Sequence, residues 1–311
     1  MSNRTVWQTA FGGPENIEIV DADVPTPGPE EVRVRVAAAG LNPVDWKVAA
    51  SEQMARAFHV SVPGGYGSDF AGVIDAVGDR VGSWSVGDRV LGAARGHAIA
   101  DYIVAPVSKL VPVPETVSLQ TAATLDIAGR TAAAAVDALH LTADDAVLIG
   151  GAAGGVGVIA VQLAVATGAQ VIATASERNH DFLRQLGAVA VAYGPGLADR
   201  VRAAADRSVT AATDLQGTEA IDAAIELGVS PERITAIAAG GASLPAGVTA
   251  TGGGNARPDA LADIQRRIGD GSLRIEIAEA YPLEETAAAV ERLREGHVRG
   301  KLVIAVDPTL V

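Results

Sequence analysis

A glycine-rich run between an apparent strand and an apparent helix constrains this chain most. The run from Val147 to Gly157 reads VLIGGAAGGVG, and apolar residues recur behind it at helical spacing: Val156, Ile159, Ala160 and Leu163. Glycines let a backbone approach an anion closely, and the N–H groups at a helix N-terminus face it. The order strand, small-residue turn, helix therefore predicts the pyrophosphate-binding turn of a dinucleotide fold. A helix start whose glycines serve tight packing alone is the alternative.

The turn departs from a strict G-x-G-x-x-G, because it reads Ala152-x-Gly154-x-x-Gly157. Alone it leaves NAD, NADP and FAD open, so the tip of the next strand has to discriminate. An NAD site places Asp or Glu there, about 20 residues past the glycines. Here the tip ends in Ser176, and Arg178 follows two residues later. A guanidinium pairs well with a 2′-phosphate, which favours NADPH. Glu177 argues against it, and a solvated Arg178 is the alternative.

Strands and helices alternate from Ala146 to about Gly254, which predicts a doubly wound parallel sheet. The expected strands are Ala146–Ile149, Val171–Ala175, Val189–Tyr193, Ala211–Leu215, Ile234–Ala239 and Val248–Thr251. The expected helices are Val156–Thr167, His180–Leu186, Leu197–Ala205 and Glu219–Leu227. An alanine-rich helical stretch begins near Ser118 and leads into this region.

The first 115 residues are instead rich in short β-like segments broken by Pro and Gly. The clearest are Ile17–Val20, Glu31–Val36, Phe70–Val77, Arg89–Leu91 and Tyr102–Val104. After the parallel region come a helix at Pro258–Ile268 and a strand near Ile275. A second helix at Leu283–Glu295 and a last strand at Leu302–Val306 follow. We therefore expect an α/β chain with a dinucleotide-binding domain at 119–256, preceded by a mostly β part at 1–118 and followed by a further part at 257–311.

Composition excludes several classes of function. The chain has 311 residues, 49% of them hydrophobic, which suffices for two cores. Its 37 Asp and Glu outnumber 24 Lys and Arg, a net charge of −13 that disfavours nucleic acid. The lack of cysteine excludes disulfides, thiolate metal sites and cysteine nucleophiles. Since no stretch is long and apolar enough for a signal peptide or membrane span, we expect a cytoplasmic protein.

Several separate segments together resemble one known family. AAAGLNPVDWK (Ala37 to Lys47), GSDFAGVIDAVGDRV (Gly67 to Val81), VGDRVLG, IAGRTAAAAV, GAAGGVG, LRQLGA and EGHVRGKLVIAV occur in order along nearly the whole chain. The chain is thereby identified as similar to the zinc-independent quinone oxidoreductases of the medium-chain dehydrogenase/reductase superfamily. The resemblance implies a Rossmann cofactor domain, a GroES-like substrate domain and a homodimer.

The departures from zinc-dependent relatives concern their metal ligands. The stretch that would carry the first ligand reads GLNPVD, and the one that would carry the second reads YGSDFAG, with Ser68 and Asp69 in place of a His-Glu pair. With no metal to polarise an alcohol, we expect reduction of an electron-poor acceptor. The histidines lack ligand spacing, and we assign no metal site.

The resemblance also implies which residues meet the cofactor and the acceptor. Asn42 would lie beside the nicotinamide, and Thr131 would approach the cofactor. Further cofactor contacts are implied at Ala152, Gly154, Gly155, Val156, Gly157, Ser176, Arg178, Tyr193 and Ile237.

The expected chemistry is hydride transfer to a quinone or enone, followed by protonation. Besides Asn42, the candidate catalytic residues are Tyr66, a possible hydrogen-bond donor, and Lys47 with its neighbour Asp45. For Tyr66 the alternative is a tyrosine that covers a turn, and for Lys47 an ion pair with Asp45 or Asp69. Two other functions stay open: an enoyl reductase acting on a thioester, and an NADPH-binding sensor without turnover.

Overall fold

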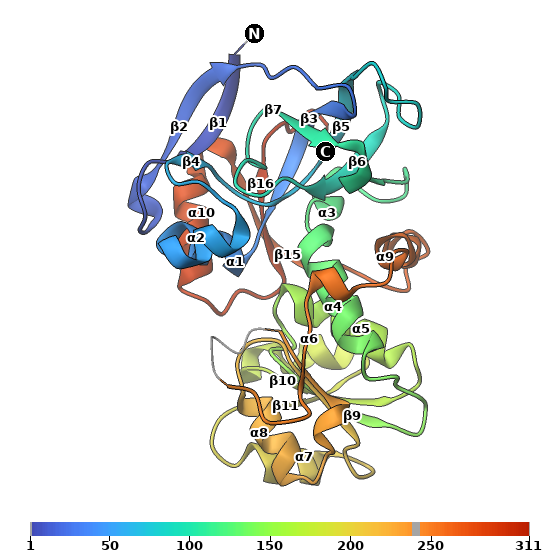
Figure 1. Ribbon diagram of the computed structural model, residues 1–311. Coiled ribbons are helices and arrows are strands. Elements are labelled where there is room, and N and C mark those ends of the chain that lie inside the picture. Colours follow the sequence, from blue (N-terminus) through green and yellow to red (C-terminus); the bar gives the residue numbers. More distant parts are fainter. Residues whose placement is uncertain (1, 238–242, 311) are drawn as a thin grey trace. The chain divides into compact units, whose positions relative to one another are not determined.

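The computed structural model describes residues 2–237 and 243–310, and its ribbon is drawn in Figure 1. The chain divides into two compact units: Met1–Ile127 with Leu261–Asp270 and Ile277–Val311, and Ala128–Ala260 with Gly271–Glu276. We had expected the first crossing at 118 and the return at 257. The first crossing lies instead inside helix α4 (Leu125–Asp137), and residues 271–276 return to the second unit.

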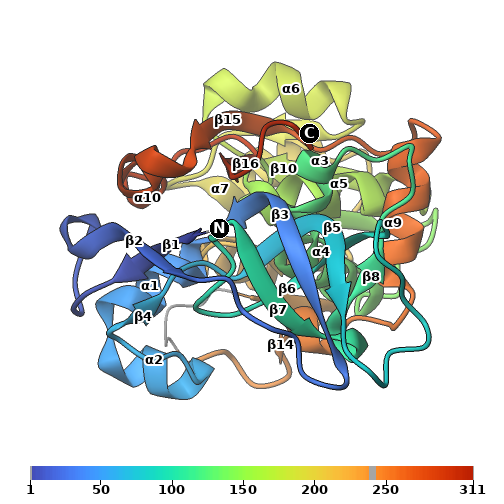
Figure 2. The ribbon, with the colours of Figure 1, turned by 90° about the horizontal axis from the view of Figure 1, so that it is seen from above.

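The first unit is built on a seven-stranded sheet in the order β15-β16-β3-β5-β6-β8, with β7 also paired to β3. Figure 2 shows β3, β5, β6 and β7 side by side. Every pairing in this sheet is antiparallel except β15 with β16. The strands are β3 (Glu31–Leu41), β5 (Asp69–Val77), β6 (Arg89–Ala93), β7 (Tyr102–Pro106), β8 (Val111–Pro112), β15 (Ile277–Pro282) and β16 (Lys301–Ala305).

A smaller three-stranded sheet and five helices complete this unit. The sheet has the order β2-β1-β4, with β1 (Ser2–Gln8), β2 (Ile17–Asp23) and β4 (Gly64–Gly65). The helices are α1 (Pro43–Ala50), α2 (Glu52–Phe58), α3 (Leu119–Ala122), α9 (Ala260–Gly269) and α10 (Thr286–Arg294). Alternation along β3 buries Val32, Val34 and Val36 in one core with Phe70 and Ile74.

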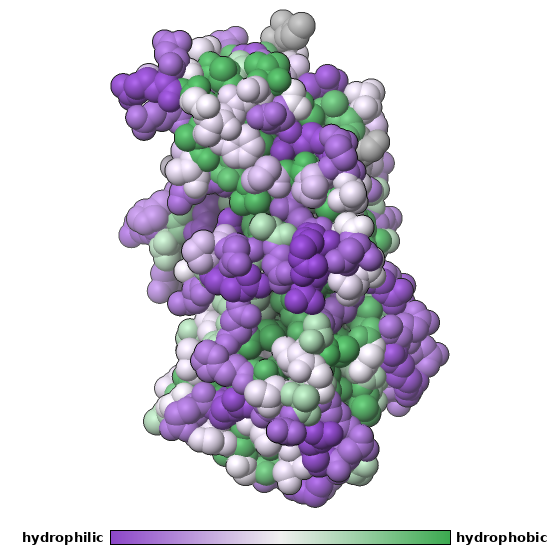
Figure 3. Space-filling model, turned by 90° about the vertical axis from the view of Figure 1, so that its right-hand side faces the viewer, coloured by the Kyte–Doolittle hydropathy of each residue, from purple (hydrophilic) through white to green (hydrophobic). Residues whose placement is uncertain are grey.

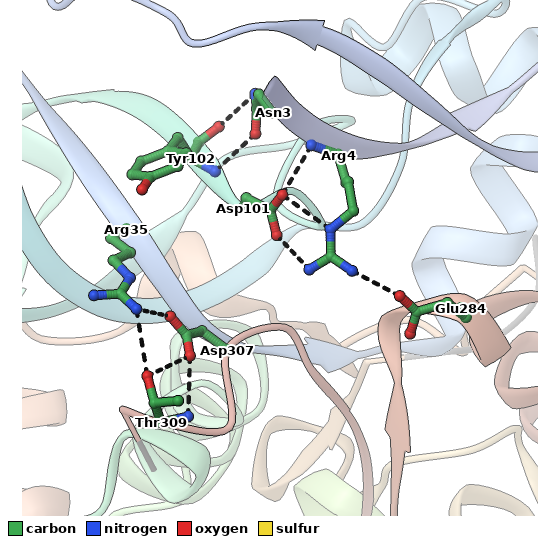
Figure 4. Close-up of polar contacts among 8 residues, drawn as sticks. All are labelled: Asn3, Arg4, Arg35, Asp101, Tyr102, Glu284, Asp307 and Thr309. Atoms are coloured by element: carbon green, nitrogen blue, oxygen red, sulfur yellow. Dashed lines mark hydrogen bonds and ion pairs between the residues drawn. The ribbon is translucent and has the colours of Figure 1, made fainter. Parts of the chain in front are cut away.

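Polar contacts hold β1 and the chain's C-terminal segment in this unit, as Figure 4 shows. The guanidinium of Arg4 donates to both carboxylate oxygens of Asp101 and pairs with Glu284 at 2.6 Å. Arg35 pairs with Asp307. These contacts join residues that lie far apart in the sequence.

The second unit is a parallel sheet in the order β11-β10-β9-β12-β13-β14. Counted from β9, this is the 3-2-1-4-5-6 order of a doubly wound nucleotide-binding fold, so the predicted fold class is confirmed. The strands are β9 (Ala146–Gly150), β10 (Gln170–Thr174), β11 (Val189–Val191), β12 (Ala211–Asp214), β13 (Ile234–Ala236) and β14 (Thr249–Ala250). The helices are α5 (Gly155–Val165), α6 (His180–Gln185), α7 (Leu197–Ala204) and α8 (Glu219–Glu226), and α4 belongs mainly to this unit.

Several elements differ from the sequence-based expectation. β13 ends at Ala236, and residues 238 and 239 of the expected strand lie outside the described residues. The strand expected near Ile275 begins at Ile277. The helix expected from Leu283 starts with a 3₁₀ turn, and α10 follows from Thr286. Strand β1 and helices α1 and α2 were not predicted, because β1 lacks a clean alternation and the two helices are short, with α1 beginning at a proline.

The surface is mainly hydrophilic on one face. On the face drawn in Figure 3, hydrophilic residues are spread over the whole length of the view, with smaller hydrophobic areas between them. Among the described residues, no helix is long and apolar enough to cross a membrane.

Candidate functional site

The glycine turn lies at the point where the doubly wound sheet reverses its strand order. Strand β9 is hydrogen-bonded to β10 on one side and to β12 on the other. The chain therefore leads from β9 to its neighbours on one side first and later to those on the other side, and the turn after Gly150 lies where these two directions part. Ligands of this sheet type bind outside the carboxyl ends of the strands at that position. The sequence therefore places its most glycine-rich segment where this fold binds ligands.

Local geometry explains why glycines occupy the turn. Gly151 has φ +70°, a left-handed conformation that favours glycine. A Cβ on Gly157 would lie 2.3 Å from the carbonyl oxygen of Gly151, so this position packs backbone against backbone. A Cβ on Gly154 would lie 3.5 Å from that oxygen, its nearest neighbour, which is an ordinary contact. Gly157 is thus required by the turn itself, whereas no contact among the described residues requires glycine at 154.

Helix α5 starts directly behind this turn. Gly154 is its N-cap and offers no side-chain acceptor to the first N–H groups of the helix. Those N–H groups have no partner within a helix, and they carry the positive end of the helix dipole. Gly154, Gly155 and Val156 are half-exposed, while Ala152 and Gly157 are buried. The geometry suits an anion such as a pyrophosphate.

The other predicted cofactor residues of this unit follow the carboxyl ends of neighbouring strands. Ser176 and the exposed Arg178 come after β10, Tyr193 after β11, and Ile237 after β13. The Ser176 hydroxyl accepts a hydrogen bond from the Asn179 side chain at 3.3 Å, and Tyr193 is 48% exposed. Thr131 is buried on α4. Because the carboxyl ends of parallel strands share one edge, the four residues that follow strands gather at the edge that carries the glycine turn.

In the first unit, Asn42 is the centre of a buried polar cluster. Its backbone N–H donates to Asp45 Oδ2 at 2.8 Å, and its side-chain Nδ2 donates to Asp69 Oδ2 at 3.0 Å. Lys301 Nζ donates to Asn42 Oδ1 at 2.5 Å and to the Leu41 carbonyl at 2.8 Å. The Ser68 hydroxyl donates to Asp45 Oδ1 at 2.6 Å. We define these residues, Asn42, Asp45, Ser68, Asp69 and Lys301, as the Asn42 cluster.

Three elements build the Asn42 cluster. Asn42 caps helix α1 at the end of β3, and Asp69 begins β5, the strand next to β3. Lys301 begins β16, which pairs with β3 on its other side. All five side chains are buried, with Asp69 at 0% and Lys301 at 4% exposure. The sheet register thus brings together groups that lie up to 259 residues apart.

Burial and charge act in opposite directions on the ionisable groups of the cluster. Burial raises the pKa of Asp69 and lowers the pKa of Lys301, and the opposite charge of each partner counteracts both shifts. Burial also raises the pKa of Asp45, against hydrogen bonds from Ser68 and Asn42. Two carboxyls and one amine share this pocket, so their protons are coupled.

Tyr66 lies between β4 and β5 and is 3% exposed, yet its hydroxyl has no hydrogen-bond partner among the residues that the structure describes. It lines a small cavity with residues that include Gln8, Trp46 and Arg294. Burial raises the pKa of Tyr66, and the Asp45 charge adds to this while Arg294 opposes it. The hydroxyl therefore remains protonated at ordinary pH and is a donor without an acceptor.

Lys47 lies outside the Asn42 cluster. Its Nζ is 5.7 Å from the centroid of the Trp46 ring, a cation–π distance. The alternative of a Lys47 ion pair with Asp45 or Asp69 was wrong, because the ammonium beside those carboxylates belongs to Lys301. Lys301 is not among the site residues predicted from the sequence. The available signal was a charged residue at the head of an apolar strand, KLVIAV, where a lysine is rarely buried without a partner.

The two stretches that would carry metal ligands in zinc-dependent relatives meet within the Asn42 cluster, through the hydrogen bond from Ser68 to Asp45. Across residues 2–237 and 243–310, no three His, Cys, Asp or Glu side chains are arranged to hold a metal ion.

Comparisons with known proteins agree with this architecture. Residues 28–115 match the family described as "Alcohol dehydrogenase GroES-like domain". The solved structure of the quinone oxidoreductase from Coxiella burnetii superposes with a TM-score of 0.85 at 30% identity, covering 99% of this chain and 100% of that one.

Curated relatives match over shorter shares of their own length. A quinone oxidoreductase from Pseudomonas aeruginosa is 38% identical over 182 residues, which is 58% of this chain and 55% of that protein. A mycocerosic acid synthase-like polyketide synthase from Mycolicibacterium smegmatis is 32% identical over 96% of this chain, which spans only 15% of that protein.

Three findings agree and together show the family: the strand order of the parallel sheet, the match of residues 28–115 to the GroES-like domain, and the superposition over 99% of the chain. This chain belongs to the quinone oxidoreductase-type family of the medium-chain dehydrogenase/reductase superfamily.

Proposed function

We propose that the protein is an NADPH-dependent oxidoreductase that reduces a quinone or another α,β-unsaturated carbonyl compound without zinc. The observation that carries the proposal is the glycine turn, which combines an anion-binding helix start with the strand-order reversal of the sheet. The names of the relatives from Coxiella burnetii and Pseudomonas aeruginosa support the acceptor class.

The residues present fit a nicotinamide dinucleotide. Gly154 leaves space in front of the α5 N-terminus, where its N–H groups would hold the pyrophosphate. Ala152, Gly155, Val156 and Gly157 complete this cradle. Thr131, Tyr193 and Ile237 are further candidates for cofactor contacts.

The choice of NADPH over NADH rests on the tip of β10. Ser176 offers a hydroxyl there and Arg178 a guanidinium, and an arginine binds phosphate in bidentate fashion. Glu177 is the opposing charge, and it is exposed. We therefore propose Arg178 as the residue that selects the 2′-phosphate.

When bound, the reduced nicotinamide supplies a hydride to the acceptor, which also gains a proton. The protein's part is to orient the reactants, exclude water and supply or relay that proton. We propose Asn42 for orientation, because its amide is held from both sides. The protonated Tyr66 hydroxyl and the Lys47 ammonium are the two candidate proton or hydrogen-bond donors.

Zinc independence rests on the residues that replace ligands. Without cysteine the chain lacks the thiolates of the zinc-dependent branch, and Ser68 is engaged with Asp45. We therefore expect turnover to survive treatment with a chelator followed by gel filtration. A proportional loss of activity that added zinc restores would contradict this part of the proposal.

An enoyl reductase is the second candidate, because the match to the polyketide synthase runs over 96% of this chain. The solved CurK enoyl reductase also superposes with a TM-score of 0.85 at 25% identity. The two candidates share the fold and the cofactor and differ in the acceptor.

One assay separates the candidates: NADPH oxidation with a panel of quinones, enones and enoyl thioesters. Fastest turnover with quinones or simple enones supports the first proposal, and fastest turnover with thioesters supports the second. Tight NADPH binding with no oxidation by any acceptor would reject both and favour a sensor role. A homodimer and residence in the cytoplasm are further proposals; light scattering of the purified chain tests the first.

A further inference from the structure

The buried lysine of the Asn42 cluster is a group that the proposed reaction has not yet used. Lys301 is 4% exposed, and its ammonium donates to the Leu41 carbonyl and to Asn42 Oδ1. Among the described residues it forms no direct ion pair; the charges of Asp69 and Asp45 act on it from farther away. Burying an ammonium is costly unless it is hydrogen-bonded and compensated. Its direct partners are two oxygens, the side-chain Oδ1 of Asn42 and the backbone carbonyl of Leu41.

The neighbours of Asn42 leave its amide one orientation. Lys301 in its charged form only donates, so it requires the amide oxygen. Asp69 Oδ2 accepts a hydrogen bond from the amide at 3.0 Å, so the amide nitrogen has to face Asp69. The observed contacts satisfy both, with Oδ1 toward Lys301 and Nδ2 toward Asp69. A flipped amide would set N–H groups against the ammonium and oxygen against the carboxylate.

The same contacts decide what Asn42 still has to offer. Its Nδ2 carries two hydrogens; one is donated to Asp69 and the other to the Gly40 carbonyl at 3.3 Å. Its Oδ1 has two lone pairs, and Lys301 occupies one. The amide thus keeps acceptor capacity and has no donor left.

We propose that Lys301 is a positioning residue that fixes the Asn42 amide as a hydrogen-bond acceptor for an N–H or O–H group of the bound reactants. This rests on the proposed function for the identity of those reactants. The chemical groups that fit are the carboxamide N–H of a nicotinamide and a ribose hydroxyl, whereas the carbonyl oxygen of an acceptor does not fit. Asp69 completes the arrangement from the opposite side of the amide.

The test compares Lys301→Met with Lys301→Gln in the full chain. Both variants are neutral and of similar length, but glutamine keeps an N–H donor for Asn42 Oδ1 and methionine does not. With NADPH and the best acceptor of the panel, we expect Lys301→Met to lower kcat by about 10- to 100-fold, as for a misplaced reactant. We expect Lys301→Gln to retain clearly more activity, and we expect the NADPH dissociation constant of both to stay within about 5-fold of the wild type.

A double-mutant cycle separates positioning from simple loss of structure. If Lys301 acts through Asn42, adding Lys301→Met to Asn42→Ala changes kcat by no more than about 3-fold, because the group to be positioned is already gone. Multiplication of the two single losses would overturn the proposal, as would equal kcat losses in the methionine and glutamine variants. If Lys301→Met does not fold, Lys301→Ala takes its place in the cycle, because alanine also removes the donor to Asn42 Oδ1.

Hydrogen exchange of the Asn42 side chain tests the role of Lys301 without any enzyme activity, so its result is independent of the proposed function. The side-chain amide protons of Asn42, assigned by their loss in Asn42→Ala, should exchange slowly with solvent in the wild type and in Lys301→Gln. In Lys301→Met they should exchange at least about 10-fold faster, because the amide is then held from one side only. Unchanged exchange overturns the role of Lys301 even if the enzyme is active. Protected protons in a protein without turnover reject only the proposed function.

Discussion

Alanine substitutions at two glycines of the turn should separate what the protein needs from what a cofactor needs. In Gly157→Ala, the new methyl would lie 2.3 Å from the Gly151 oxygen and 2.6 Å from the carbonyl carbon and oxygen of Ala152. These are backbone atoms, so no side chain can rotate away. In Gly154→Ala the nearest atom is 3.5 Å away, and the backbone at φ −78° and ψ 175° suits any residue.

The magnitudes follow from these contacts. Overpacking a rigid site costs up to about 3 kcal/mol, and alanine in a helix recovers about 1 kcal/mol relative to glycine. Gly157→Ala should therefore lose about 2 kcal/mol of unfolding free energy in urea. Gly154→Ala should lose no more than about 1 kcal/mol, because alanine is a poorer N-cap than glycine but meets no close atom.

The loss of NADPH affinity should be large in Gly154→Ala, the variant that loses less unfolding free energy than Gly157→Ala. If a pyrophosphate lies against Gly154, a methyl there displaces it, and we expect at least about a 10-fold weaker affinity, or about 1.4 kcal/mol. Gly82→Ala is the matched control, because a Cβ there meets nothing within 4 Å. The assay is titration of NADPH fluorescence. A Gly154→Ala protein that folds normally and binds NADPH as tightly as the wild type would refute the proposed pyrophosphate site.

Three further predictions concern single side chains. Arg178→Ala should weaken NADPH binding by about 10-fold or more and leave NADH binding nearly unchanged; equal losses for both, by the same titration, would remove Arg178 from cofactor selection. Tyr66→Phe removes a buried hydroxyl that has no partner, so urea unfolding should show a gain of up to about 1 kcal/mol, and a loss above 1 kcal/mol would mean that the hydroxyl is bonded. For Asp145, burial acts to raise the pKa, but hydrogen bonds from Thr210 and Thr142 and the charge of Arg233 outweigh it and lower the pKa to about 2. The ionised carboxylate therefore adds stability above about pH 4, which is lost as the pH falls toward 2, so the deficit of Asp145→Asn should shrink over that range; a deficit that does not depend on pH would contradict the assignment.

The cofactor unit was predictable because its signals are local. Each strand of the parallel sheet is a short apolar run, and each helix begins behind a turn residue, so β9, α5 and β10 were placed within a residue or two. The strand order, and with it the position of the glycine turn at the reversal, comes from the structure.

The Asn42 cluster could not be predicted in full, because its partners come from distant strands. Asn42, Asp45 and Asp69 stand in segments that resemble the family, but nothing local joins them to Lys301. The pairing of β16 with β3 brings that lysine to the end of β3. No short sequence pattern predicts which residues pair between two strands when the partners lie 259 residues apart. The missing Tyr66 partner is likewise a property of packing, since a hydroxyl's neighbours depend on four separate segments.

Transfer of deuterium from the nicotinamide is the most direct test of the central claim. NADPH labelled at C4 is incubated with the protein and an enone, after removal of metal ions, and the product is analysed by mass spectrometry and NMR. We predict that the label appears on the β-carbon of the reduced enone and that the α-carbon takes its proton from solvent. Bound NADPH that is never consumed, or a reduced product without the label, would contradict a metal-free hydride transfer by this protein.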